Sequence, residues 1–280
     1  MKKSPIYILI ATIIWGSTFP LMKLSLNFIN PVFFNFLRFI IASIIFLPIS
    51  YKGIAKSGKN EFFKGLILGI FVTSGYIFQI IGLKYTDPDS STFITSLYIV
   101  VAPILAYFFL KEDLMPKNIF SLILAIIGLL IFSQAYEYGL NFGDILTLIS
   151  AVSYGFQVVL IDKYSKEIDI MVLSSYQLFF VTIFTAILLP FYGIQIKLNF
   201  ELIFIVIYIS IFATALALFL QVLGQKDLDS KTASFIFVFE PVFGAIFSYF
   251  ITNEKFNCLM VIGSILILIA SIVSIYQKNH

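Results

Sequence analysis

Apolar residues dominate a series of long stretches along the chain, and charged residues or Gly, Pro and Asn separate one stretch from the next. Each stretch holds about 20 residues, the length that an α-helix needs to cross the roughly 30 Å hydrocarbon core of a bilayer. The pattern predicts ten transmembrane helices and therefore an all-α membrane protein. The predicted spans cover approximately residues 5–27, 31–50, 63–84, 90–110, 117–134, 141–161, 170–192, 201–221, 230–251 and 257–276.

The overall composition is also that of a membrane protein. Of the 280 residues, 60% are hydrophobic and 12% are charged, and the mean hydropathy is +1.02. These values lie well outside the usual range of soluble domains. The connections between the apolar stretches are short, so we expect the bundle in the bilayer to make up the whole protein.

Basic residues are distributed unevenly between the two ends of the predicted bundle. Cytoplasmic loops of membrane proteins are enriched in Lys and Arg close to the ends of their spans. With the N-terminus inside, the inner segments hold thirteen of the 18 basic residues and the outer segments hold Lys84, Lys197 and Lys255. We therefore expect a multi-pass protein of the cell membrane, plasma or inner, with both termini in the cytoplasm. The net charge of +3 follows from this topology and does not point to nucleic acid as a partner.

The second half of the chain repeats part of the first. Residues 82–112 align without a gap over residues 224–254, at an offset of 142. The identical pairs are Gly82/Gly224, Lys84/Lys226, Asp87/Asp229, Phe93/Phe235, Ile94/Ile236, Val100/Val242, Ile104/Ile246, Tyr107/Tyr249, Phe108/Phe250 and Glu112/Glu254. Several of these pairs are charged or glycine, which unrelated apolar spans would not share, so duplication is the simplest explanation.

The direction of the second copy follows from the number of spans. An earlier segment agrees at an offset of 139, where Trp15 and Gly16 lie over Tyr154 and Gly155. Each half contains five predicted spans, an odd number, so the second half enters the membrane from the opposite face. Such inverted repeats are typical of transporters, with the substrate site near the midplane between the halves. The expected units are residues 1–135 and residues 141–280, each a five-helix repeat.

Three segments resemble a known family. They are "WGSTFPLMK" near the N-terminus, Arg38 after an "NP" helix start, and "FEPVFGAIFSYFITNE" in the second copy. Together they resemble the EamA family of the drug/metabolite transporter superfamily, as two EamA-type halves over essentially the full chain. The resemblance implies a carrier of small metabolites or drugs, often an exporter, and leaves the substrate open.

One detail departs from the family pattern. Pro241 precedes Glu254 by thirteen residues, as the pattern requires, whereas Pro103 precedes Glu112 by only nine. The spacing predicts that the fourth span breaks about one turn nearer the cytoplasm than the ninth.

The first span contains residues that loosen a helix. Pro20 has no N–H, so the carbonyl of Gly16 loses its helical partner. In lipid such a break is tolerated where it faces protein or a water-filled cavity. We therefore predict that Trp15, Ser17 and Thr18 line a central polar cavity. The alternative is a packing kink, because Gly and Ser also permit close contact between helices.

Two charged residues lie well inside predicted spans. Arg38 is the one Arg among 18 basic residues, and a charge at this depth tends to face the interior of the bundle. Its planar guanidinium suits a carboxylate. Glu240 is the corresponding acid, so we predict a proton or cation site at Glu240 and an anion anchor at Arg38, or a direct pair of the two. The alternative is a purely structural ion pair between the second and ninth helices.

Further polar residues and prolines within spans complete the predicted site. Lys23 lies close to the end of its span, so we expect its ammonium group to reach the interface. The candidates to line the cavity are Asn35, Tyr76, Gln79, Thr95, Tyr98, Tyr154, Gln157, Gln177 and Thr214, each of which could instead form a hydrogen bond between helices. The predicted hinges are Gly16, Pro20, Pro103 and Pro241.

These features predict a secondary transporter that exports a small metabolite, such as an amino acid or related compound, by alternating access. The alternatives are an intramembrane enzyme or a scaffold acting on a lipid-linked substrate. An enzyme would need an embedded acid, base or metal constellation, but the single Cys258 and the single His280 do not provide one. We expect no cofactor and no metal, and the expected partners are the small-molecule substrate and the lipid bilayer.

Overall fold

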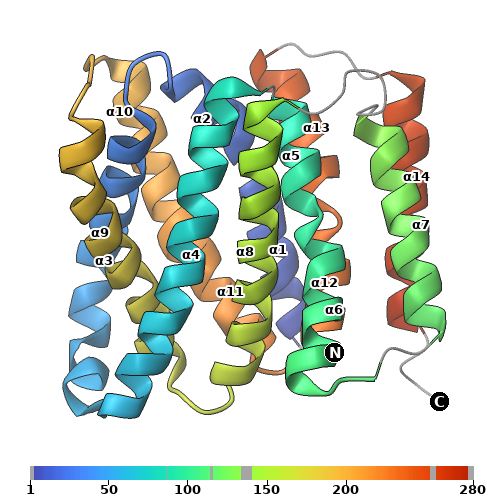
Figure 1. Cartoon of the computed structure of the whole chain (residues 1–280), viewed down its shortest axis with the longest axis horizontal. Coiled ribbons are helices and arrows are strands. Elements are labelled where there is room, and N and C mark those ends of the chain that lie inside the picture. Colours follow the sequence, from blue (N-terminus) through green and yellow to red (C-terminus); the bar gives the residue numbers. More distant parts are fainter. Residues whose placement is uncertain (1–2, 87, 114–115, 134–140, 253–256, 277–280) are drawn as a thin grey trace.

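The computed structural model describes residues 3–86, 88–113, 116–133, 141–252 and 257–276, and these form a bundle of long, roughly aligned helices (Figure 1). Glu254, Lys255 and His280 lie outside the described residues. The helices are α1 (Ser4–Gly16), α2 (Thr18–Ser25), α3 (Pro31–Lys56), α4 (Lys59–Tyr85), α5 (Pro88–Ser96), α6 (Tyr98–Leu110), α7 (Pro116–Ser133), α8 (Phe142–Tyr164), α9 (Ile170–Tyr192), α10 (Phe200–Tyr208), the π-helix η1 (Ile209–Leu216), α11 (Ala217–Gln225), α12 (Ser230–Phe237), α13 (Glu240–Thr252) and α14 (Cys258–Tyr276).

The helices are long and apolar enough for a membrane. Among the described residues, eight helices or runs of consecutive helices have the length and hydropathy to cross a bilayer: Ser4–Ser25, Pro31–Lys56, Lys59–Tyr85, Ser90–Leu110, Phe142–Tyr164, Ile170–Tyr192, Phe200–Gln225 and Ser230–Thr252. In α7 and α14 the apolar stretches found are shorter, Ile119–Gly128 and Cys258–Ala270. The predicted all-helical membrane class is confirmed.

Short polar side chains fix where several helices begin. Asn30, Asp169 and Asn199 each accept a hydrogen bond from a backbone N–H in the first turn of the helix that follows. These N–H groups have no partner within the helix, so a side-chain oxygen at this position stabilises its start.

Among the described residues, four spans are broken or distorted along their length. α1 gives way to α2 at Ser17, α5 to α6 at Leu97, and α12 to α13 at residues 238–239, while η1 widens the helix between α10 and α11. Pro20 and Pro241 lie two or three residues after their breaks, as expected of a residue that lacks an N–H.

The break in the fourth span is not where the sequence predicted it. Pro103 lies inside α6, and the break at Leu97 is 142 residues before Phe239, the offset of the repeat. The two breaks are therefore at equivalent positions, and the predicted shift of one turn is wrong. The two breaks lie where the spans meet: Tyr98, the first residue of α6, donates a hydrogen bond of 2.8 Å to Glu240, the first residue of α13.

α1 and α8 run in opposite directions through the bundle. α1 begins at the end of the bundle where α11 ends, and there the Ser4 hydroxyl donates to Asp227 (2.8 Å). α8 begins at the other end, where α4 ends and Thr86 Oγ1 donates to Asp144 (2.6 Å). α3 packs against α9, and α7 packs against α14 at one edge of the bundle (Figure 1).

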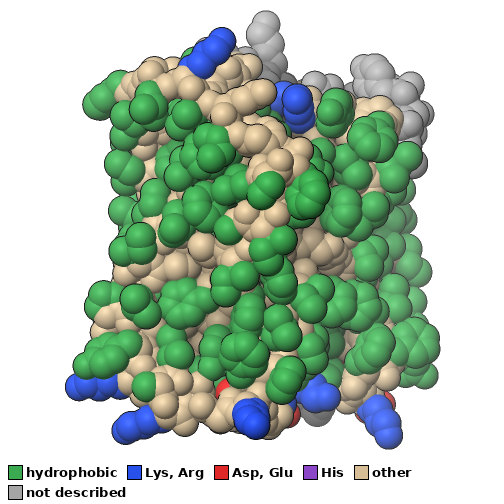
Figure 2. Space-filling view, turned by 60° about the vertical axis from the view of Figure 1, so that its left-hand side comes forward, with side chains coloured by type: hydrophobic (Ala, Val, Ile, Leu, Met, Phe, Trp, Pro, Cys, Tyr) green, Lys and Arg blue, Asp and Glu red, His purple; other side chains and the backbone are tan. Residues whose placement is uncertain are grey.

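Apolar side chains form a broad belt around the molecule, and Lys side chains lie at its two ends (Figure 2). We call the end where α3 ends and α4 begins the lysine-rich end. Its exposed lysines include Lys56, Lys59, Lys111, Lys163 and Lys226.

Candidate functional site

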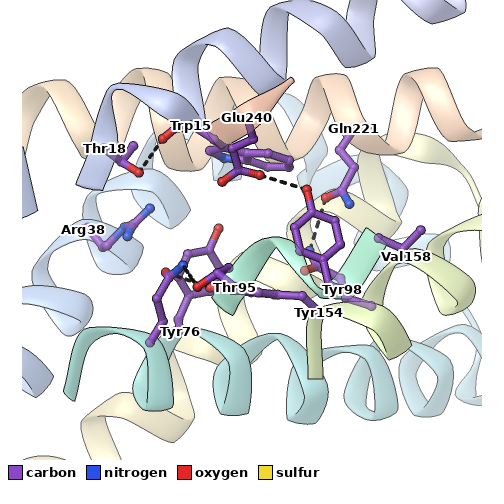
Figure 3. Close-up of a pocket in the computed structure, with 12 residues that line it drawn as sticks. Trp15, Thr18, Arg38, Tyr76, Thr95, Tyr98, Tyr154, Val158, Gln221 and Glu240 are labelled. Carbon is purple, nitrogen blue, oxygen red and sulfur yellow. Dashed lines mark hydrogen bonds between the residues drawn. The ribbon is translucent and has the colours of Figure 1, made fainter. Parts of the chain in front are cut away.

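A cavity lies between the two halves, next to the helix breaks (Figure 3). The space inside it that is open to the centres of water-sized molecules is about 40 Å³, enough for a few water molecules or small polar groups. Its walls come from the first half through Trp15, Thr18, Arg38, Tyr76, Gln79, Thr95 and Tyr98, and from the second half through Tyr154, Gln157, Val158, Gln221 and Glu240.

Arg38 brings a buried positive charge to one wall. Its side chain projects from α3 and is 1% exposed. Nε donates to Thr214 Oγ1 at 2.8 Å, and the guanidinium carbon lies 4.7 Å from the centre of the Tyr76 ring. A buried charge is costly unless it is paired, and no carboxylate of the described residues lies within ion-pair distance of Arg38. The ring face compensates the charge only in part.

Glu240 brings a buried negative charge to another wall. It begins α13, is 6% exposed, and accepts the hydrogen bond from the Tyr98 hydroxyl at 2.8 Å. Figure 3 shows its carboxylate and the Arg38 guanidinium on different sides of the cavity. No ion pair joins Arg38 and Glu240 among the described residues, so the predicted direct pair and the structural ion pair are both absent.

The break in the first span faces the cavity on one side and packs against α13 on the other. Towards the cavity, Thr18 Oγ1 donates to the Trp15 carbonyl at 2.7 Å, and Trp15 Nε1 donates to the Ala213 carbonyl at 2.9 Å. On the other side, a Cβ added to Gly16 would lie 2.7 Å from Phe243 Cβ, so α1 and α13 touch closely there. The structure thus combines the cavity and the packing kink that the sequence offered as alternatives.

Amide side chains form a third wall. Gln157 Nε2 donates to Gln177 and to Gln221, both at 3.2 Å. The Tyr154 hydroxyl donates to Gln79 Oε1 at 3.0 Å, and the rings of Tyr76 and Tyr154 meet edge to face with centroids 5.4 Å apart. These contacts hold polar groups and aromatic faces around the same space.

Comparison with known proteins gives the family. The EamA-like transporter family matches residues 2–134 and again residues 141–276. The chain belongs to this family. EamA proteins are part of the drug/metabolite transporter superfamily, so the predicted resemblance is confirmed.

Similar proteins carry transporter names. An uncharacterized transporter of Archaeoglobus fulgidus is 34% identical over 264 residues, which cover 94% of this chain and 83% of that protein. A second from the same organism is 25% identical over 100% of this chain and 99% of its own length, and YoaV of Bacillus subtilis, also an uncharacterized transporter, is 22% identical over 95% and 94%. A protein of known crystal structure, 16% identical, matches 100% of this chain and 99% of its own with a TM-score of 0.82, which shows the fold alone.

In this EamA chain, most of the predicted residues lie at the cavity. Those at its walls are Trp15, Thr18, Arg38, Tyr76, Gln79, Thr95, Tyr98, Tyr154, Gln157 and Glu240. Four others lie behind the walls. The Ser17 hydroxyl donates to the Ile14 carbonyl, Asn35 donates to the Tyr76 carbonyl, Gln177 supports Gln157, and Thr214 holds Arg38.

The remaining predicted residues have structural contacts. Lys23 Nζ donates to the carbonyls of Leu83 (2.8 Å) and Thr86 (2.6 Å), at the end of α4. It therefore caps a neighbouring helix near the end of the bundle. Of the predicted hinges, Gly16, Pro20 and Pro241 are next to breaks and Pro103 is not.

Two cavity residues of this EamA chain, Gln221 and Val158, were missed. Val158 is one of many apolar residues in its span and carries no signal. Gln221 could have been found, because extending the aligned repeat by three residues at the offset of 142 places it over Gln79. Both glutamines line the cavity.

Proposed function

We propose that this EamA protein is a secondary transporter built from two five-helix units, residues 1–135 and residues 141–280, that make ten spans and are inverted in the membrane. The central cavity would open alternately to either side as the two units rock against each other. The opposite directions of α1 and α8, and the pairing of α3 with α9 and of α7 with α14, support this arrangement.

Matched glycine contacts support the inverted repeat further. A Cβ added to Gly16 would lie 2.7 Å from Phe243, and one added to Gly155 would lie 2.6 Å from Val101. The two glycines are 139 residues apart and their partners are 142 residues apart, the two offsets of the repeat. Equivalent residues therefore make equivalent contacts between the halves.

A second matched pair lies at the ends of the bundle. A Cβ added to Gly82 would lie 2.8 Å from the Gly143 carbonyl oxygen, and one added to Gly224 would lie 3.0 Å from the Ser4 carbonyl oxygen. Gly143 and Ser4 are also related by the offset of 139. A two-fold relation between the halves accounts for both pairs of contacts.

As the substrate of this cavity we propose a small zwitterion, such as an amino acid, moved outwards. The observation that carries the proposal is the buried Arg38 guanidinium, which faces the cavity and has no carboxylate partner among the residues that the structure describes. A substrate carboxylate would supply the missing anion, and the substrate ammonium group would face Glu240 on another wall. The aromatic faces of Tyr76 and Tyr154 would contact the apolar part of the molecule.

The test is competition for transport in vesicles that contain the purified protein. We expect an amino acid to compete at least ten times better than its N-acetyl derivative, which lacks the cation, or its decarboxylated amine, since a buried charge loses several kcal/mol when its partner is removed. Arg38→Gln should abolish the preference for the carboxylate, while Lys197→Gln, an exposed lysine far from the cavity, should keep it. Equal competition by the amine and the amino acid would exclude a zwitterion site.

A further inference from the structure

A row of buried polar side chains leads from the cavity to the lysine-rich end. From the cavity, Gln157 on α8 is followed five residues later by Asp162, and Gln221 on α11 is followed four residues later by Gln225. On α12, Ser230 and Ser234 face the same region, because α8, α11 and α12 pack together. We call these six residues the polar seam.

The polar seam is buried, and its hydrogen-bonding groups are only partly satisfied. Asp162, Gln225, Ser230 and Ser234 are each 0% exposed. Gln225 Nε2 donates to the Val158 carbonyl at 2.9 Å, but its buried Oε1 has no hydrogen-bond partner. A buried polar group without a partner is costly, so the seam suits a path that water or substrate enters in another conformation.

A cluster of charges closes the seam at the lysine-rich end. Asp162 accepts two hydrogen bonds from Ser230, from its N–H and its hydroxyl, both at 2.7 Å, and it pairs with Lys166. The Glu112 side chain, just beyond α6, faces Asp162, and its Oε2 lies 3.6 Å from Lys231 Nζ. The cluster thus ties the end of the fourth span to the first and fourth spans of the other half.

The backbone aims Glu112 at this cluster. Lys111 ends α6 in the left-handed conformation (φ 54°), which is unfavourable for a residue other than glycine. The turn lets the Glu112 N–H donate back to the Ala106 carbonyl, and it brings Lys231 Nζ within 2.7 Å of the Asp113 carbonyl.

We propose that Glu112, Asp162 and Lys231 form a proton-controlled latch that closes the lysine-rich end of the transport path. A protonated Glu112 donates to the Asp162 carboxylate and holds the latch shut. When Glu112 loses its proton, two adjacent carboxylates repel each other and the latch opens. The proposal rests on the proposed transport function for its role, but its closing and opening can be measured without a substrate.

The charges around Glu112 give the direction of the pH effect. Burial, the hydrogen bond to Asp162, and the negative charges of Asp162 and Asp229 raise the pKa of Glu112 to about 7, against the opposing effect of Lys231. Lys166 already pairs with Asp162. In the open latch, water would return this pKa towards its ordinary value of 4.5. The preference for the closed latch is therefore full below pH 4.5 and is lost as the pH rises to about 7.

The test measures access to the polar seam in nanodiscs, where both ends of the protein face the solution. Ser234→Cys is made in a Cys258→Ser background and labelled with a charged thiol reagent. Rates are divided by those of Lys56→Cys, an exposed position at the same end, which removes the pH dependence of thiol reactivity. We expect labelling to rise about tenfold from pH 5.5 to 7.5.

Two variants of the latch and one control variant test whether Glu112 controls the labelling. Glu112→Gln, which can still donate to Asp162, should keep labelling low at every pH, and Lys231→Gln should move the rise to higher pH. Glu167→Gln, a carboxylate paired with Lys64 at the same end, should leave the profile unchanged. Labelling of Ser234→Cys that does not change with pH, or that changes equally in Glu112→Gln, would overturn the latch.

A further cysteine separates the latch from the transport proposal. Thr92 is 142 residues before Ser234 and lies towards the other end of the bundle. If the two units alternate, labelling of Thr92→Cys should fall as that of Ser234→Cys rises. A response of Ser234→Cys alone would leave the latch standing and count against alternating access.

Discussion

At the scale of single residues, the cavity contains two opposite charges that the protein keeps apart. Thr214 fixes the Arg38 guanidinium and Tyr98 fixes the Glu240 carboxylate, each through a hydrogen bond of 2.8 Å. Each of these partners is a neutral hydroxyl, so it orients the charge without neutralising it. A ligand with both charges would complete the electrostatics of the site.

The substitution Glu240→Gln tests whether the negative charge on the cavity wall binds the substrate ammonium group. Glutamine still accepts the hydrogen bond from Tyr98 but has no charge, so we expect the apparent affinity for an amino acid to fall tenfold or more, as when one member of a buried charge pair is removed. The affinity for its deamino analogue, which has only the carboxylate, should stay within about twofold.

The readout for Glu240→Gln is competition for transport in vesicles, with Glu201→Gln as the matched control because Glu201 is an exposed carboxylate. Unchanged affinity for the amino acid would show that Glu240 does not face the ammonium group. Full activity would also exclude Glu240 as the site of a coupling proton.

At the scale of helices, close contact between backbones limits what the breaks can tolerate. Next to the break in the first span, a Cβ on Gly16 would meet Phe243 Cβ at 2.7 Å and the Gly244 backbone nitrogen at 2.9 Å. At the equivalent Gly155, the nearest atom is a methyl group of Val101, at 2.6 Å. A side chain can rotate away from an added methyl group more readily than a backbone can move.

We therefore expect Gly16→Ala to destabilise the protein more than Gly155→Ala. Overpacking of this kind costs about 1–3 kcal/mol, and Gly16→Ala should lie at the upper end of that range. Thermal unfolding in detergent measures both variants, and each serves as the control for the other. A larger loss of stability in Gly155→Ala would contradict the role assigned to the α1–α13 contact.

The helices themselves could be predicted from the sequence, but their distortions only in part. Apolar length alone located the spans, and Pro20 and Pro241 marked two breaks. The π-helix η1 contains neither Gly nor Pro and gave no signal. Within it, the Thr214 hydroxyl donates to the Ile209 carbonyl five residues back (2.8 Å) and accepts from Arg38 on another helix. Such a contact between distant segments cannot be inferred from local sequence.

Most residues of the site could be predicted from the sequence, but the contacts between them could not. Charged and polar residues inside apolar spans are few, and their cost in lipid makes them face the interior, so Arg38, Glu240 and three of the buried glutamines, Gln79, Gln157 and Gln177, were found. The contacts between these residues and their partners were not predicted. Arg38 lies against Thr214 and Tyr76 because α3, α4 and η1 meet at one depth, and this packing exists only in three dimensions.

At the scale of the whole molecule, the axis of the proposed two-fold relation passes between Tyr98 and Glu240. These residues are 142 apart, the offset of the repeat, and they hydrogen-bond to each other. Two equivalent positions in contact must lie at the axis that relates the halves. The backbone breaks are thus at equivalent positions, but the side chains there differ: one is a tyrosine and the other a glutamate. The two units could therefore exchange conformations while the charges of the site keep one orientation.

The orientation of the whole bundle can be tested with the natural cysteine. Cys258 is exposed at the start of α14, and α14 begins at the end of the bundle opposite the lysine-rich end (Figure 1). Because lysine-rich ends face the cytoplasm, we expect Cys258 to lie outside the cell. A membrane-impermeant maleimide should label it in intact cells, whereas Lys111→Cys in a Cys258→Ser background should react only after the membrane is opened. The opposite pattern would reverse the proposed topology and with it the direction in which the latch at Glu112 faces.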